Sequence, residues 1–122
     1  MTIEITRREV LAGAGAIGAA TLLPAMANAA PGDAAAGAVL ADIAEELLAD
    51  YPENALYLGI DKGKRAVLRS RFADRTHAAD LDRAGRATKR LAQLRAIDRH
   101  SLSNAVALDA DTAQSAYELA VA

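Results

Sequence analysis

The 122-residue sequence contains no cysteine and no tryptophan, and its aromatic residues are limited to three tyrosines and one phenylalanine. The absence of cysteine excludes a disulfide framework. Because large rings usually supply much of the buried area of a small core, alanine and leucine must form the core here. A small domain with neither disulfides nor many aromatic side chains is poorly equipped to be stable by itself.

The N-terminus has the features of a bacterial twin-arginine export signal. Arg7 and Arg8 precede a glycine-rich apolar run from Val10 to Leu23, and Ala27 and Ala29 form a small-x-small cleavage site. The run has about 14 residues, fewer than the roughly 20 that a helix needs to cross a bilayer. A removable signal is therefore favoured over a retained membrane anchor.

We accordingly expect residues 1–29 to be the signal, recognised by the twin-arginine export machinery and cleaved after Ala29. Residues 30–122 would then be released into the periplasm with no stable membrane anchor. That segment is long enough for one small domain or for part of a larger one.

One motif inside the signal is misleading. Residues 13–18 match the dinucleotide-binding pattern G-x-G-x-x-G, but no strand precedes them, and a βαβ unit cannot be completed before Pro31. The sequence therefore predicts no bound nucleotide and no other cofactor in this chain.

The remainder predicts an all-α fold of about three or four helices, with the first and third antiparallel. Apolar residues recur at helical spacing over Ala34–Asp50, Pro52 ends that helix, and Glu46 lies among the charged residues expected on its solvent face. A short second helix is predicted over Lys64–Phe72 and a third over Ala78–Ile97. Ser101 or Ser103 would cap the last helix through its side-chain oxygen.

The last helix carries apolar or small residues on two nearly opposite faces. Val106, Ala110, Ala113, Tyr117 and Ala120 form one face, and Leu108, Thr112, Ser115 and Leu119 form the other. Such a helix is expected to have neighbours on both faces. Because no glycine cap or polar tail follows before Ala122, we interpret the chain as the incomplete N-terminal part of a larger helical domain.

Charge is strongly segregated along the chain. Residues 30–61 hold seven acidic and no basic residues, whereas residues 62–99 hold twelve basic and four acidic residues. The basic stretch could bind an anionic surface or nucleic acid, or it could pair with the acidic first helix. Pairing is favoured over nucleic-acid binding, because Phe72 alone offers a stacking ring in the basic stretch.

No catalytic or metal-binding constellation is present in the sequence. The two histidines, His77 and His100, are too far apart to share a helical turn, and both lie in polar stretches where solvation is the simpler reading. The acidic pairs at 45–46, 80–82 and 109–111 point away from each other on a helix. Tyr57 and Tyr117 could line a substrate cleft, but packing is the simpler role. We therefore predict no catalytic, metal or cofactor-binding residue.

Four segments together resemble the start of a bacterial family, the proteins with domain of unknown function 885 (DUF885). They are the export signal, LADIAEELL at 40–48, YPENALYLGIDKG at 51–63, and an LS pair at 102–103 before the helix with YELA at 117–120. The resemblance covers nearly all of residues 30–122 but only the first part of the family's domain. It implies a mostly helical, zincin-like metallopeptidase whose H-E-x-x-H helix lies far downstream.

In that motif two histidines hold zinc and the glutamate activates its water. None of those residues is present here, so zinc is expected only in the full-length family. The resemblance implies that this chain is a scaffold part of an exported metallohydrolase. The expected partner of the chain is the missing C-terminal part of the same domain. The alternatives are a small periplasmic helical binding or adaptor protein, and a binder of anionic surfaces.

Overall fold

The computed structural model describes residues 29–122, and residues 31–122 form one compact unit. The predicted twin-arginine pair, Ala27 and the glycine-rich run lie outside the described residues. Ala29 is the first described residue. The described part is helical and has no strand, which confirms the all-α prediction. Its elements are α2 (Asp33–Asp50), α3 (Glu53–Tyr57), the 3₁₀ helix η1 (Gly63–Ser70), α4 (His77–Arg95), the 3₁₀ turn η2 (Arg99–Ser101) and α5 (Asn104–Ala120).

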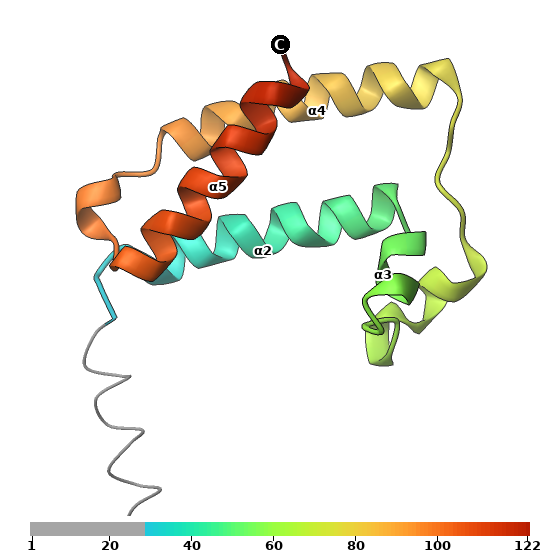
Figure 1. The fold of residues 1–122 in the computed structure, drawn as a ribbon, viewed down its shortest axis with the longest axis horizontal. Helices are drawn as coiled ribbons and strands as arrows, with labels where there is room; N and C mark the ends of the chain where they lie inside the picture. The colour runs from blue at the N-terminus through green and yellow to red at the C-terminus, as the bar shows by residue number, and fades with distance from the viewer. Residues whose placement is uncertain (1–28) are drawn as a thin grey trace, which may run out of the picture. The chain divides into compact units, whose positions relative to one another are not determined.

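Helices α2 and α4 run antiparallel, and α5 packs against both of them (Figure 1). Two cross-helix ion pairs show the opposite directions of α2 and α4: Arg86 pairs with Asp50, and Arg90, one turn later on α4, pairs with Glu46, one turn earlier on α2. All three helices contribute buried apolar side chains: Ala36 and Ile43 from α2, Leu91 and Leu94 from α4, and Ala110 from α5. The core is thus small and made of aliphatic residues, as the composition requires.

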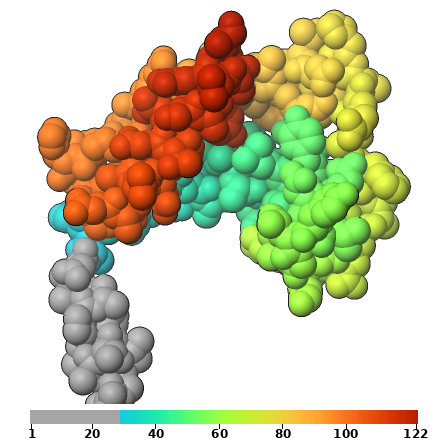
Figure 2. Space-filling view, viewed as in Figure 1, coloured from blue at the N-terminus to red at the C-terminus, as the bar shows by residue number. Residues whose placement is uncertain are grey.

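A second, smaller cluster lies beyond the end of α2. Leu48 packs with Ala55 and Leu68, and Ile60 covers them. Glycines at positions 59 and 63 have φ angles of +66° and +56°, which let the chain reverse between α3 and η1. We call residues 52–72 the α3–η1 lobe; in Figure 2 it forms a bulge, in green to yellow-green, apart from the orange and red surface of α5.

Local end signals explain most helix boundaries. Helix α2 ends at Asp50, directly before Tyr51 and Pro52, as predicted. Helix α4 is capped by Thr76, whose hydroxyl oxygen accepts a hydrogen bond from the Ala79 amide at 3.3 Å. No helix among residues 29–122 is long and apolar enough to cross a membrane.

The predicted serine cap of α5 is wrong in its chemistry. Ser103 does occupy the N-cap position, but its side chain makes no capping hydrogen bond. Its backbone amide instead donates to Asp33 Oδ1 at 2.8 Å. A carboxylate from the first turn of α2 therefore joins the starts of two helices that lie 70 residues apart in the sequence.

The same junction brings Gly32 against η2. The Gly32 amide donates to the Ser101 carbonyl oxygen at 2.9 Å, and a Cβ at position 32 would lie 2.9 Å from that same oxygen and against the Ser101 hydroxyl. The space beside the Gly32 Cα holds only its hydrogen atom, and a methyl group there would displace the Ser101 backbone.

We expect Gly32→Ala to lower the free energy of unfolding by about 1–2 kcal/mol, because the added methyl group overpacks this junction. Gly37→Ala is the matched control, since its Cβ would meet nothing within 4 Å and alanine favours helix by up to about 1 kcal/mol. Urea denaturation followed by circular dichroism measures both. Equal stability of the two variants would contradict the assigned contact.

Candidate functional site

A network of arginines and carboxylates joins α2 to α4. Arg86 Nη2 donates to both carboxylate oxygens of Asp50 at 2.6 and 2.7 Å, and its Nη1 contacts Asp82 on the same helix. Arg90 donates through Nη2 to Glu46 Oε2 at 2.9 Å and through Nε to Glu46 Oε1 at 3.3 Å. The Arg90–Glu46 pair joins two nitrogens to two oxygens, which is the geometry that makes guanidinium–carboxylate bonds strong, whereas Arg86 contacts both Asp50 oxygens through one nitrogen.

The position of Glu46 corrects the sequence analysis, which had placed this residue on the solvent face of the first helix. Its side chain is half-buried between α2 and α4, because Arg90 supplies a cation at that contact. Hydrogen bonding to Glu46 raises the pKa of Arg90 above its usual value, and hydrogen bonding to Asp50 does the same for Arg86. Arg86 Nε is buried without a hydrogen-bond partner in the described part of the chain; Glu46 Oε1 is 3.9 Å away.

A cleft of about 290 Å³ opens beside this network, between α2, α4 and α5. Its walls include Tyr51, Arg83 and Tyr117, and the Arg83 guanidinium carbon lies 5.4 Å from the centre of the Tyr51 ring. Burial, reinforced by the Glu46 carboxylate, raises the pKa of Tyr117 above its usual value, so this phenol stays protonated. Tyr117 is half-buried against the network, in agreement with its predicted packing role.

The charges of the cleft neutralise one another. Arg83 pairs with Asp80 at 2.6 Å and also donates to the Asp74 carbonyl oxygen at 2.7 Å, while Arg86 is held by Asp50. A guanidinium that is already bound to a carboxylate offers little to an external anion. The cleft therefore has the character of a structural seam between the three helices.

Arg99 closes the other end of the helical unit. Its Nη1 donates to the carbonyl oxygens of Leu94 and Ile97, both at 3.0 Å, at the C-terminal end of α4, where among the described residues the Leu94 carbonyl otherwise accepts only a 3.3 Å bond from the Ile97 amide. The rest of the guanidinium reaches α5, where Nε donates to Asp111 and Nη2 to Gln114. The sequence analysis did not single out this residue; a basic side chain shortly after a helix end is the signal that could have identified it.

Pairing with carboxylates accounts for most of the basic stretch, as the sequence analysis favoured. Of its twelve lysines and arginines, eight lie within salt-bridge distance of a carboxylate. Arg65 donates through Nε to Glu45 Oε1 at 3.1 Å, and Arg69 Nε donates to the buried Asp61 at 2.6 Å, which lowers the Asp61 pKa. The four without an ion pair in the described part are Lys62, Arg71, Arg75 and Lys89.

The structure does not bring the two histidines together. His77 begins α4, His100 lies in η2 beyond the other end of that helix, and both are exposed. Within residues 29–122, no three histidine, aspartate or glutamate side chains form a group that could hold a metal ion.

Two apolar surfaces are left uncovered within the described residues. On α5 the predicted first face packs inward, but Leu108 and Leu119 on the second face are 66% and 81% exposed. We predicted that both faces of the last helix would have neighbours, but among the described residues only the first face of α5 has them. Tyr57, for which packing was predicted, is 89% exposed at the end of α3, and Phe72 is 84% exposed just after η1.

Comparison with protein families, curated proteins and solved structures found no match to this chain. The DUF885 resemblance therefore stays a prediction.

Proposed function

We propose that this chain is the N-terminal helical part of an exported metal-dependent hydrolase of the DUF885 type, in which it serves as scaffold and supplies no metal ligand. The proposal is supported by the sequence resemblance and by the twin-arginine pattern at the N-terminus. A single structural observation carries it further: the outer face of α5, which we define as Leu108, Thr112, Ser115 and Leu119, has no covering element among the described residues.

The outer face of α5 is more apolar than its composition suggests. The Thr112 hydroxyl donates to the Leu108 carbonyl oxygen one turn earlier at 2.8 Å, so its polar group is satisfied within the helix. Leu108 and Leu119 lie at either end of the face, both more than half exposed. Covering a leucine side chain fully stabilises a complex by roughly 1.5–3 kcal/mol, so two of them supply a substantial docking energy.

The occupant we assign to this face is a helix from the downstream part of the same parent domain. A helix with apolar residues one turn apart fits such a stripe by ridges-into-grooves packing. The opposite face of α5 already packs on α2 and α4, so α5 would become the central helix between two layers. The arginine network would then hold α2 and α4 rigid behind it, as a scaffold requires.

The test has a genetic and a biochemical arm. The coding region downstream of residue 122 is expected to encode a helix with H-E-x-x-H, and the segment it encodes should co-purify with this chain when both are co-expressed. Leu119→Glu should reduce the co-purified amount at least tenfold, because it places a charge in the buried contact. Leu81→Glu is the matched control, since Leu81 is 62% exposed and belongs to a different helix, α4.

A downstream region without H-E-x-x-H would contradict the enzyme assignment. Equal co-purification of the Leu119→Glu and Leu81→Glu variants would contradict the docking face. The first outcome would favour the alternative function, a small periplasmic helical binding or adaptor protein, and residues 30–122 alone should then unfold cooperatively on heating.

A further inference from the structure

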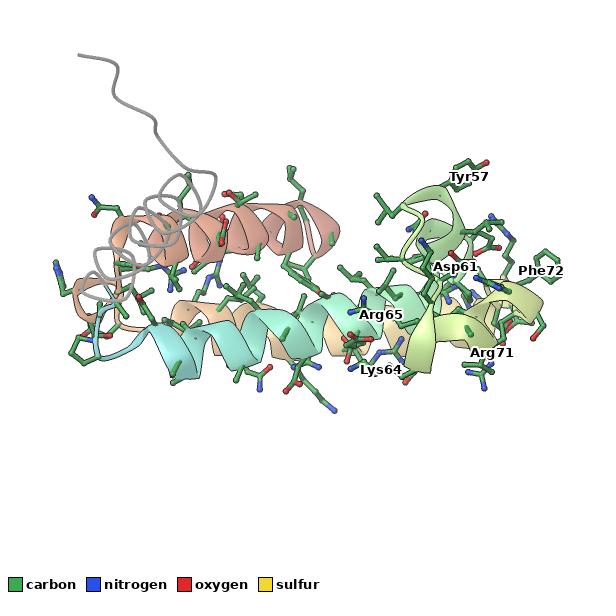
Figure 3. All side chains as sticks on the ribbon, turned by 90° about the horizontal axis from the view of Figure 1, so that it is seen from below. Tyr57, Asp61, Lys64, Arg65, Arg71 and Phe72 are labelled. Carbon is green, nitrogen blue, oxygen red and sulfur yellow. The ribbon has the colours of Figure 1, made fainter. Side chains whose placement is uncertain are left out.

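The α3–η1 lobe has more exposed large hydrophobic side chains for its 21 residues than the rest of the described chain has. Among residues 29–122, eleven large hydrophobic side chains are exposed, and five of them belong to the lobe: Leu56, Tyr57, Leu58, Val67 and Phe72. Figure 3 shows Tyr57 and Phe72 pointing outward from the lobe, away from α2. Such a concentration of exposed apolar groups on a small unit indicates a binding surface.

The charge of the lobe is equally one-sided. Residues 52–72 contain five basic and two acidic residues, a net charge of +3. The two acidic side chains are both engaged, because Asp61 accepts from Arg69 and Glu53 accepts from the Ala73 amide. Lys62 and Arg71 have no ion pair in the described residues, and Lys64 is largely exposed, with its ammonium 3.7 Å from Glu45. Figure 3 shows the Arg71 and Phe72 side chains projecting from the lobe in different directions.

We propose that the α3–η1 lobe binds the surface of a membrane containing anionic lipids. Exposed aromatic and aliphatic side chains beside unpaired cations match the boundary between lipid headgroups and acyl chains, where rings insert and cations contact phosphates. The contact is shallow and reversible and involves no spanning helix, in keeping with the absence of one among residues 29–122. It uses a different surface from the outer face of α5 and does not depend on the proposed enzyme function.

A lipid surface accounts for the lobe better than a nucleic acid does. Single-stranded nucleic acid would use the two rings for stacking and the cations for phosphates, but it offers no apolar partner for Leu56, Leu58 and Val67. A bilayer interface offers an apolar partner to aliphatic and aromatic side chains alike. Eight basic residues, most of them on or near α4, already have carboxylate partners. They therefore attract a lipid phosphate or a nucleic-acid phosphate less strongly than Lys62 and Arg71 do.

The test uses the full chain and vesicles of phosphatidylcholine with or without phosphatidylglycerol, with binding measured by co-sedimentation. Lys62→Gln should weaken binding to the anionic vesicles about fivefold, the usual contribution of one lysine near an anionic surface. Lys89→Gln is the matched control, because Lys89 is also exposed and unpaired but lies on α4, outside the lobe. Residues 1–28 are identical in every variant, so any binding through them adds the same background.

A second arm tests the apolar contribution. Phe72→Ala should weaken binding roughly tenfold, since a ring at the interface buries a large apolar area, whereas Leu108→Ala should leave binding unchanged. Raised salt should weaken wild-type binding. Equal binding to neutral vesicles, equal effects of Lys62→Gln and Lys89→Gln, or equal effects of Phe72→Ala and Leu108→Ala would overturn the proposal. So would lobe-dependent binding to a single-stranded oligonucleotide without binding to vesicles.

Discussion

Leu94→Ala is expected to lower the free energy of unfolding by about 3 kcal/mol, the largest effect of any single substitution considered for this chain. Leu94 is fully buried on α4. Removing its three outer carbons loses their transfer free energy and leaves a cavity that a small aliphatic core can fill only in part. With few aromatic residues to take over the lost contacts, the core has little reserve.

The measurement is urea denaturation of the full chain, followed by circular dichroism at the helical band. Leu108→Ala makes the same chemical change at a site that is 66% exposed, and it should change stability by no more than about 0.5 kcal/mol. If the two variants lost similar free energy, α4 would not supply the core of this unit as described.

Arg86→Met should lower the free energy of unfolding by about 2 kcal/mol. The methionine retains most of the aliphatic stem, so the loss comes from the charge. The half-buried Asp50 would keep its negative charge without the guanidinium that holds both of its oxygens. Breaking a fully buried pair costs about 3–5 kcal/mol, and the partial exposure of this pair reduces that cost.

Arg95→Met is the matched control, because Arg95 is on the same helix but its pair with Glu118 is solvent-exposed. Its effect on stability should be much smaller, since water screens an exposed pair. Thermal unfolding of both variants in low salt gives the comparison. A larger loss in Arg95→Met than in Arg86→Met would show that the cross-helix network does not hold α4 on α2.

Local signals were sufficient to predict α2, α4 and α5, but the short helix α3 was not predicted, and the helix predicted over residues 64–72 is the 3₁₀ helix η1. These signals are the apolar period over residues 34–50, Pro52 after it, and the glycines at 59 and 63. Each acts within one or two turns of the chain, so the structure that it favours does not depend on distant residues. The order of these helices along the chain follows from the same signals. The separation of acidic and basic stretches was enough to favour pairing between them, although not to say which residues pair.

The candidate surfaces could be predicted only in part. The two-faced pattern of α5 was visible from residue spacing, but which face would be covered depends on where α2 and α4 lie in space. The exposure of Tyr57 and Phe72 was missed for the same reason. An aromatic residue at the end of a short helix packs or projects according to what the following segment covers. Here Leu68 of η1 packs with Ala55, and both rings stay exposed.

The sequence by itself determined that this protein is helical, aliphatic in its core and divided into acidic and basic stretches, because these properties depend on composition and on neighbours a few residues apart. Only the tertiary structure decided that Glu46 lies between helices, that Asp33 joins the starts of α2 and α5, and that Lys62 and Arg71 are left without carboxylate partners. Those outcomes depend on contacts between residues tens of positions apart. Such contacts are set by how the helices cross, and no local pattern records that.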